Sequence, residues 1–160
     1  MRTIVYSPDP ILEKTSLLVD QFDSSLLELS EEMIELMYKH KGVGISAPQV
    51  GELLRVISFM PIDTVADYPK PPRILVNPII YDFSKNFSEE WEGCLSLPGL
   101  SVKISRPDWI DVHAQDEYGN EFNERFNFLQ SRIIQHEINH LDGILISRYQ
   151  TYNNIKLLIS

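Results

Sequence analysis

The sequence contains a single cysteine, Cys94, so no disulfide can form within the chain. Scarce cysteine is typical of proteins in a reducing compartment, and it predicts a cytoplasmic location. No apolar run approaches the roughly 20 residues that a membrane-spanning helix requires. The N-terminus carries Arg2 but reaches Asp9 and Pro10 before any long apolar stretch, which does not fit a secretory signal. The sequence therefore predicts no membrane partner.

Positive charge is also scarce, because 14 Lys and Arg residues stand against 23 Asp and Glu residues and leave a net charge of −9. A phosphate backbone would be repelled, which argues against nucleic acid as a direct partner. The apolar share of 43% and the charged share of 23% are ordinary for a globular protein and exclude a disordered chain. We therefore expect one domain over residues 1–160, active as a monomer.

Two helices are predicted. Apolar residues recur at helical spacing over about residues 25–40, and Ser25 followed by Glu28 fits a capping box at its start. A second helix is expected from about Leu129 to Gly143, a residue suited to the left-handed position that ends a helix.

Several strands are predicted between the two helices, from short apolar runs or alternating patterns. They cover residues 54–60, 73–80, 108–115 and about 121–127, and a turn at Gly119 and Asn120 joins the last two. Residues 61–72 are expected to form an exposed loop, and the tail from Tyr149 is left unassigned. This order predicts an α+β fold, with mainly antiparallel sheets around a central C-terminal helix.

That C-terminal helix contains the stretch "RIIQHEINHLDGIL". His136 and His140 are four residues apart, so both side chains face the same way and can bind one metal ion. Glu137 lies about 100° around the helix from His136 and can act as a general base without being a ligand. The alternative is a half-buried helix whose polar groups are satisfied by neighbours. The repeated histidine favours the metal site.

Two histidines leave a catalytic metal site one protein ligand short. Asp142 follows His140 too closely to share its ion, and no other downstream residue is evident. Cys94 in "EEWEGCLSLPG" is the upstream candidate. From spacing alone, three roles stay open for it: a metal ligand, an inert core residue, and a nucleophile paired with a histidine.

The stretch "GVGISAPQ" spans residues 42–49. Gly42, Gly44 and Pro48 predict a loop at which the backbone approaches another group closely. The dinucleotide-binding pattern does not fit, because it needs a third glycine and a following helix. Gln49 is either a donor to a developing oxyanion or part of a surface turn.

Taken together, "GVGISAPQ" (42–49), "EGCLS" (92–96) and "QHEINH" (135–140) resemble the three ordered motifs of the peptide deformylase family. "SPDPILEKT" near the N-terminus also matches, so the resemblance covers nearly the whole chain. It implies a metal-dependent hydrolase that removes the formyl group from the N-terminal formylmethionine of newly made proteins and releases formate.

The resemblance also implies residue roles. Cys94, His136 and His140 would bind the metal, with a metal-bound water as the nucleophile. Glu137 would take the proton of that water and later deliver it to the leaving amine. Gln49 and the backbone N–H of Leu95 would hold the formyl oxygen. In the family the metal is typically Fe²⁺, and Zn²⁺ or Ni²⁺ can replace it.

Substrate binding is implied in the same way. Gly44 and its neighbours would bind the peptide main chain as an added strand. The substrate-binding residues expected on this basis are Val43, Gly44, Ile45, Glu92, Gly93, Leu129 and Ile133, with the methionine pocket formed by Val43, Ile45, Leu129 and Ile133. Glu92 is also expected to support the ligands from behind. The partners implied are formylmethionyl nascent peptides and a transient ribosome contact.

The sequence departs from the family pattern at three positions. Ser46 replaces a frequent alanine, and Asn139 replaces a frequent aspartate, so an ion pair there becomes at most a hydrogen bond. Ser101 stands where many members have an arginine that helps to hold the substrate, and Lys103 is a candidate replacement. Arg106 matches a basic position of the family, although an ordinary surface ion pair would also explain it.

Three other functions are weighed against this one. A zincin-type endopeptidase would need a third ligand downstream of His140. A metal-containing protein that captures peptide N-termini without turnover would not need Glu137 or Gln49, and both are present. A deformylase with altered substrate choice remains a rival because of Ser101.

Overall fold

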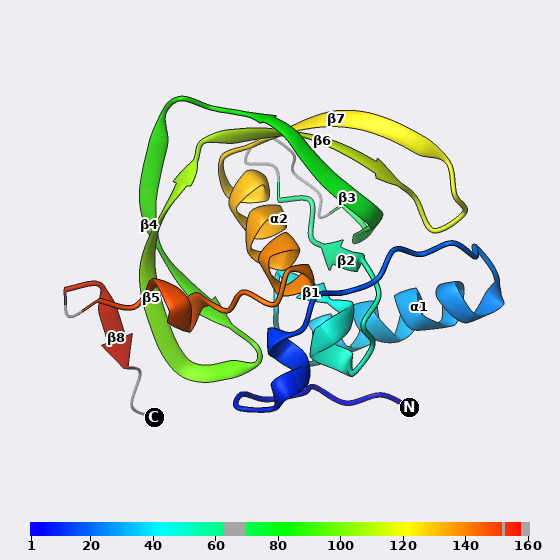
Figure 1. Ribbon diagram of the computed structural model, residues 1–160, viewed down its shortest axis with the longest axis horizontal. Helices are drawn as coiled ribbons and strands as arrows, with labels where there is room; N and C mark the ends of the chain where they lie inside the picture. The colour runs from blue at the N-terminus through cyan, green and yellow to red at the C-terminus, as the bar shows by residue number, and fades with distance from the viewer. Residues whose placement is uncertain (63–69, 152, 158–160) are drawn as a thin grey trace.

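The computed structural model describes residues 1–62, 70–151 and 153–157. Within these ranges the chain forms two antiparallel sheets and two α-helices (Figure 1). The five-stranded sheet has the order β1-β2-β3-β6-β7, with strands Gly44–Ser46, Val56–Phe59, Arg73–Phe83, Trp109–Gln115 and Glu121–Asn127. The three-stranded sheet has the order β4-β5-β8, with strands Phe87–Cys94, Leu97–Pro107 and Ile155–Leu157. The helices are α1 (Ser24–Lys39) and α2 (Phe128–Leu141), and short 3₁₀ turns are η1 (Pro10–Glu13), η2 (Ala47–Val50) and η3 (Ile146–Tyr149).

The expected α+β class is confirmed, and Figure 1 shows α2 in the centre, between the large sheet and the curved hairpin of β4 and β5. Both helices begin and end within about two residues of their predicted limits. No helix in the described ranges combines the length and the apolar character needed to cross a membrane.

The start of α1 differs from its prediction. Asp23 is the N-cap, and its carboxylate accepts hydrogen bonds from the backbone N–H groups of Ser25 and Leu26 at 3.0 and 3.3 Å. Ser25 is already inside the helix, where its hydroxyl donates to the same carboxylate at 2.7 Å. The predicted capping box of Ser25 and Glu28 is therefore wrong, because the preceding aspartate already accepts these N–H groups.

The hydrophobic core lies on both faces of the five-stranded sheet. Val56 belongs to the cluster that packs on α1, and the next residue, Ile57, belongs to the cluster on α2. In the second cluster the rings of Phe59 and Phe126 meet edge to face, with centroids 5.6 Å apart. A strand buried on both faces reads as a continuous apolar run, which explains why this strand was predictable.

Other segments depart from the sequence reading. Residues 42–49 were predicted to be a loop but contain β1 and most of η2, and the hairpin of β4 and β5 was not predicted at all. β4 reads "FSEEWEGC" and buries only Glu92, so it lacks an apolar alternation. Pairing with β5 from Phe87 to Cys94 holds it instead. Residues 63–69 of the predicted loop 61–72 lie outside the described residues.

The end of α2 leads to a first testable prediction. Gly143 follows the C-cap Asp142 with φ +71°, as the predicted stop requires, and a Cβ there would collide with the backbone carbonyl of Glu13. Gly143→Ala is expected to lower the free energy of unfolding by about 2–4 kcal/mol, because left-handed strain adds to a backbone clash. Urea unfolding measures the change.

Gly51 supplies the matched control. It also has a positive φ, +88°, but no atom lies within 4 Å of a Cβ built there. Gly51→Ala should therefore cost only about 1 kcal/mol of strain. Equal losses for the two variants would contradict the proposed contact with Glu13.

Candidate metal centre

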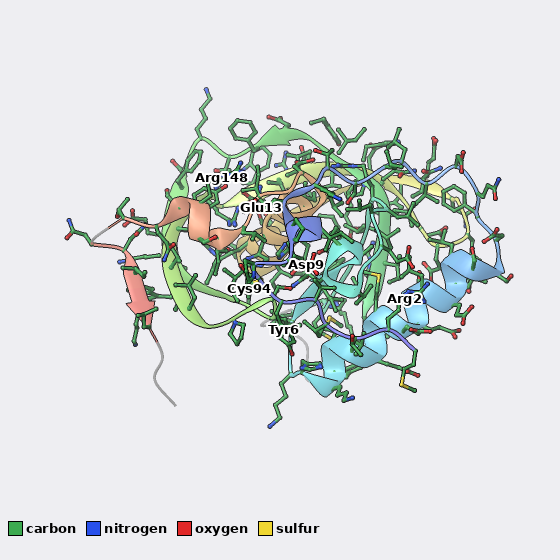
Figure 2. The ribbon with its side chains drawn as sticks, turned by 60° about the horizontal axis from the view of Figure 1, so that its bottom comes forward. Arg2, Tyr6, Asp9, Glu13, Cys94 and Arg148 are labelled. Atoms are coloured by element: carbon green, nitrogen blue, oxygen red, sulfur yellow. The ribbon has the colours of Figure 1, made fainter. Side chains whose placement is uncertain are left out.

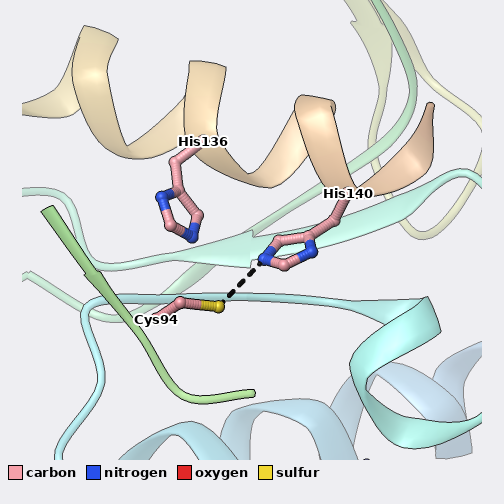
Figure 3. Close-up of side chains that lie close together, drawn as sticks. All are labelled: Cys94, His136 and His140. Atoms are coloured by element: carbon pink, nitrogen blue, oxygen red, sulfur yellow. Dashed lines mark hydrogen bonds between the residues drawn. The ribbon is translucent and has the colours of Figure 1, made fainter. Parts of the chain in front are cut away.

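Three side chains from two elements converge beside α2. His136 and His140 lie one turn apart on this helix, and Cys94 ends β4 (Figure 3). One potential ligand atom from each residue lies within 4.8 Å of the other two. Cys94 Sγ is 3.4 Å from His140 Nε2, and the two imidazole rings are 5.0 Å apart. One thiol and two imidazoles are a donor set suited to Fe²⁺, Zn²⁺ or Ni²⁺.

The hairpin of β4 and β5 positions Cys94. Pairing shifts register between Glu92 and Cys94, and Cys94 then pairs with Leu97 across the tight turn. Such a bulge redirects the side chain next to it. The N-terminal segment passes alongside, since Ser7 N–H donates to the Ser96 carbonyl at 2.9 Å; Figure 2 shows Tyr6, Asp9 and Cys94 in this region.

The electrostatics of the two histidines differ. Burial and the neighbouring His136 lower the pKa of His140 well below its usual value, so this imidazole is neutral. Burial alone would lower the pKa of His136, but hydrogen bonds to Cys94 and Glu92 outweigh it and raise this pKa to about 10. A metal ion that binds here therefore has to displace a proton from His136.

Glu137 lies on the same turn as His136 and is 4% exposed. Its Oε2 is buried without a hydrogen-bond partner among the described residues, and so is Nδ1 of His140. Burial raises the pKa of Glu137 to about 7, although His136 acts in the opposite direction. A carboxylate with a pKa near neutrality can both accept and return a proton, as general acid–base chemistry requires.

Gly44 on β1 packs directly against this carboxylate. A Cβ at Gly44 would lie 2.6 Å from Glu137 Oε1 and 2.8 Å from Ile133 Cγ2. Contacts below 3.0 Å require one of the groups to move. The close approach predicted from the two glycines is therefore present, and Glu137 is the group approached.

Glu92 is 7% exposed and is bonded to three neighbouring side chains. Its Oε1 accepts hydrogen bonds from His136 Nδ1 and Arg106 Nη2, both at 2.9 Å, and its Oε2 accepts from Arg106 Nε at 2.6 Å and Arg132 Nη1 at 2.7 Å. Burial would raise the pKa of Glu92, but the bonds from His136 and Arg106 outweigh it and lower the pKa to about 2. The carboxylate is fully engaged and orients His136, as expected of a residue that supports the ligands; Glu92 also lines the neighbouring cavity, so its substrate-binding role stays a prediction.

The surface ion pair considered for Arg106 is also wrong. Arg106 is only 5% exposed, because Glu92 faces into the protein and draws the guanidinium inward. Its Nη1 donates to Asn139 Oδ1 at 2.9 Å. This contact is the hydrogen bond that Asn139 was expected to make in place of an ion pair.

Gln49 lies in η2 with its side-chain amide held at both ends. Its Oε1 accepts from the backbone N–H of Ser46 at 2.9 Å and from the Ser46 hydroxyl at 3.1 Å. Its Nε2 donates to Ser96 Oγ at 3.2 Å and lies 3.7 Å from Cys94 Sγ. The amide N–H₂ group therefore faces the metal ligands, and the hydroxyl of Ser46 adds a bond that alanine could not make.

A cavity of about 390 Å³ opens next to the three ligands. Its walls include most of the residues predicted for the site, namely Val43, Gly44, Gln49, Glu92, Gly93, Cys94, Leu95, Leu129, Ile133, His136 and Glu137. Ile45 is not among them. It is fully buried in the core cluster under α1, because successive residues of β1 point to opposite faces, so its assignment to the methionine pocket is corrected.

The cavity wall also contains residues that the sequence analysis missed. Trp91, Leu97 and Leu100 from the hairpin add apolar surface, and Lys41 adds an exposed cation. Trp91 directly precedes the "EGCLS" motif, and this position was the one feature of the sequence that could have predicted its place in the cavity wall. Lys103 is exposed on β5 but does not line the cavity, and Ser101 is buried where β5 pairs with β8.

Comparisons with known proteins agree with this geometry. The family model described as polypeptide deformylase matches residues 1–154. A peptide deformylase from Dictyoglomus thermophilum is 43% identical over 138 residues, covering 86% of this chain and 85% of its own. A chloroplastic peptide deformylase 1B from Oryza sativa subsp. japonica is 39% identical over 89% of this chain, which spans 52% of that relative's length.

Solved structures show the same likeness. A peptide deformylase from Plasmodium falciparum superposes with a TM-score of 0.87 at 36% identity and covers 94% of this chain and 87% of its own. One from Legionella pneumophila gives a TM-score of 0.86 at 36% identity, over 96% of this chain and 88% of its own.

Proposed function

The chain belongs to the polypeptide deformylase family, a family of hydrolases, and from this premise we propose a specific reaction and mechanism for it. The protein hydrolyses the formyl group from the N-terminal formylmethionine of newly made proteins and releases formate and a free amine. One observation carries the proposal: the ligand atoms of Cys94, His136 and His140 converge within 4.8 Å beside Glu137, whose Oε2 is buried without a partner among the described residues.

Cys94, His136 and His140 hold one divalent ion, which we propose is Fe²⁺ in the cell, with Zn²⁺ or Ni²⁺ able to take its place. The fit is supported by the mixed thiol and imidazole donors, whose ligand atoms lie within 4.8 Å of one another. When bound, such an ion acts as a Lewis acid that makes water nucleophilic at neutral pH. This leaves proton transfer and oxyanion stabilisation to the protein.

Glu137 accepts the proton that water loses as it attacks the formyl carbon. It returns this proton to the nitrogen when the carbon–nitrogen bond breaks, so a free amine and formic acid leave, the acid ionises to formate, and the Glu137 carboxylate is regenerated. A pKa near 7, caused by burial, suits both directions of transfer. Gly44 holds the carboxylate in place by contact, because no side chain intervenes between them.

Gln49 Nε2 and the backbone N–H of Leu95 donate hydrogen bonds to the formyl oxygen as it becomes negative. The support is that both residues line the cavity and that the Gln49 amide is fixed by Ser46 and Ser96. Donors fixed before the reaction need no reorganisation during it, which makes them effective.

The substrate backbone pairs with the edge of β1 that faces away from β2, its one neighbour in the sheet among the described residues. Gly93 forms the facing wall, and the methionine side chain packs against Val43, Leu129 and Ile133. No arginine is available at position 101 to hold the peptide further out. The rival hypothesis is therefore a deformylase that prefers a first residue other than methionine, and a comparison of formyl peptides with different first residues tests it.

Gly44→Ala is expected to lower kcat/KM by about 10²-fold, because the new methyl group displaces Glu137 and Ile133 and small misplacements have effects of this size. Initial rates of formate release measure the loss. The bound metal should stay near one per chain, since neither displaced residue is a proposed ligand. Unchanged turnover would contradict the proposed role of the contact.

The proposed reaction is tested by formate release from formyl-Met-Ala-Ser, with acetyl-Met-Ala-Ser and formyl-Ala-Ala-Ser as comparison peptides. We expect turnover of the formylmethionyl peptide, with the other two at least tenfold slower. Cleavage of internal peptide bonds would indicate an endopeptidase. Binding of formyl-Met-Ala-Ser without formate release would indicate a capture protein, and faster turnover of the formylalanyl peptide would indicate altered specificity.

The remaining features of the proposal concern the protein as a unit. Residues 1–160 act as one catalytic domain and as a monomer, in the cytoplasm, where a free thiol at Cys94 stays reduced. The natural partners are formylmethionyl nascent chains, met by transient contact with the ribosome.

A further inference from the structure

We propose that Arg132 is a positioning residue that sets the metal affinity of the centre. It does so by tying the hairpin of β4 and β5, which carries Cys94, to α2, which carries both histidines. This inference rests on the proposed function only in that the three ligands must bind a metal.

The centre needs such a tie because its ligands come from separate elements. His136 and His140 are fixed to each other by one turn of helix, but Cys94 ends a strand of a different sheet. A metal site works only when its ligands are held to within about 0.5 Å of the right geometry. Something must therefore fix the distance from hairpin to helix.

Arg132 makes that connection from a buried position, at 8% exposure, one turn before His136. Its Nη1 donates to Glu92 Oε2 at 2.7 Å and to the Ile104 carbonyl at 2.8 Å. Its Nη2 donates to the Ser88 carbonyl at 2.7 Å. One side chain of α2 is thus bonded to the backbones of both β5 and β4 and to a carboxylate two residues from Cys94.

The carboxylate closes the connection. Glu92 accepts from Arg132 through Oε2 and from His136 Nδ1 through Oε1, at 2.7 and 2.9 Å. These bonds therefore connect Arg132 on α2 to Glu92 on β4, and Glu92 in turn to His136, a proposed metal ligand on α2. Any movement of the hairpin away from the helix would disturb Cys94 and the orientation of His136 together.

Arg106 cannot replace Arg132 in this role. It lies on β5, so its two bonds to Glu92 join strands of the same hairpin. It reaches α2 through one neutral acceptor, Asn139 Oδ1, at 2.9 Å. His136 also donates one bond to Glu92, but the arginine bonds that cross from helix to hairpin are those of Arg132, and charge-assisted bonds are about twice as strong as neutral ones.

The test is cobalt binding by Arg132→Met, which keeps the apolar stem and removes the donors. Metal-free protein is titrated with Co²⁺, and the thiolate-to-cobalt charge-transfer absorption reports binding at Cys94. We expect the dissociation constant to rise about 10–100-fold, the range typical for groups that orient metal ligands. At saturating Co²⁺, kcat for formyl-Met-Ala-Ser should recover to within about tenfold of wild type, since Arg132 lines the cavity but its donors are engaged by Glu92, Ile104 and Ser88.

Arg125→Met is the matched control. Arg125 lies on β7, where it is half exposed, pairs with Asp111 at 2.7 Å and stacks on Trp109. Its loss removes the same charge and an ion pair with a carboxylate, and cobalt affinity should stay within about twofold of wild type. A double variant with Glu92→Gln should lose less affinity than the two single losses predict together, because both residues act through one path.

The outcomes separate the two proposals. Absence of the charge-transfer absorption in the wild-type protein would show that the metal centre itself is wrong. Normal cobalt binding by wild type with unchanged affinity in Arg132→Met would overturn the positioning role alone. If Arg132→Met does not fold, Arg132→Lys is titrated instead. Lysine keeps the charge but lacks the planar set of guanidinium donors, so unchanged cobalt affinity of this variant would also overturn the positioning role.

Discussion

Glu137→Gln is expected to keep its metal and to lose turnover of formyl-Met-Ala-Ser by about 10²–10⁴-fold, the usual contribution of general acid–base catalysis. Glutamine matches the shape of glutamate, so it should fit beside Gly44 without disturbing the ligands. It cannot accept the proton of the attacking water, and it cannot protonate the leaving amine. Metal content and initial rates of formate release, measured on one sample, check both parts.

The control for this variant is Glu35→Gln on α1, which removes the same charge far from the cavity lining and should leave turnover unchanged. Near-normal turnover by metal-loaded Glu137→Gln would remove Glu137 from the mechanism. Loss of metal together with activity would mean that Glu137 supports the ligands instead.

Cys94→Ser is expected to weaken metal binding by more than about 10²-fold. Zinc sites with four ligands bind with about 10–16 kcal/mol, or about 3 kcal/mol per ligand, and serine is a poor replacement because its hydroxyl stays protonated. Activity should fall with occupancy at micromolar metal. Competition with a chromogenic chelator measures the affinity directly.

Ser96→Ala is a useful comparison for Cys94→Ser. Ser96 is buried on the same turn and contacts Gln49 but offers no atom to the ligand cluster, so its loss should reduce turnover more than metal affinity. If Cys94→Ser bound metal as tightly as wild type, Cys94 would return to the two alternatives of core residue and nucleophile. Formate release by Cys94→Ser would then distinguish these two roles. Turnover would be lost if Cys94 were the nucleophile and kept if Cys94 were a core residue.

The elements that sequence reasoning found are those that carry their own periodic signal. α1 shows apolar residues at helical spacing, and α2 combines that spacing with a glycine stop. β2 reads as an apolar run because it is buried on both faces. The hairpin of β4 and β5 carries no such signal, since pairing and the contacts of Arg132 and Arg106 hold it rather than an apolar face.

The site shows the same division. The histidines and Glu137 are close in sequence, so helix geometry alone brings them together. The place of Cys94 beside them depends on a tertiary contact, and spacing could only leave it among alternatives. The direction of the other side chains depends on the packing of the folded chain. Ile45 points into the core, and Arg106 and Arg132 point inward to pair with Glu92. A lone arginine in the stretch "SRIIQ" gives no hint of such a partner.

The most direct test of the central claim is a metal titration of the metal-free protein, without oxygen, in which formate release from formyl-Met-Ala-Ser is followed as Fe²⁺ or Ni²⁺ is added. The three-ligand centre predicts that turnover rises linearly and stops rising at one ion per chain. Turnover by the metal-free protein, or one ion bound per chain without formate release, would contradict it.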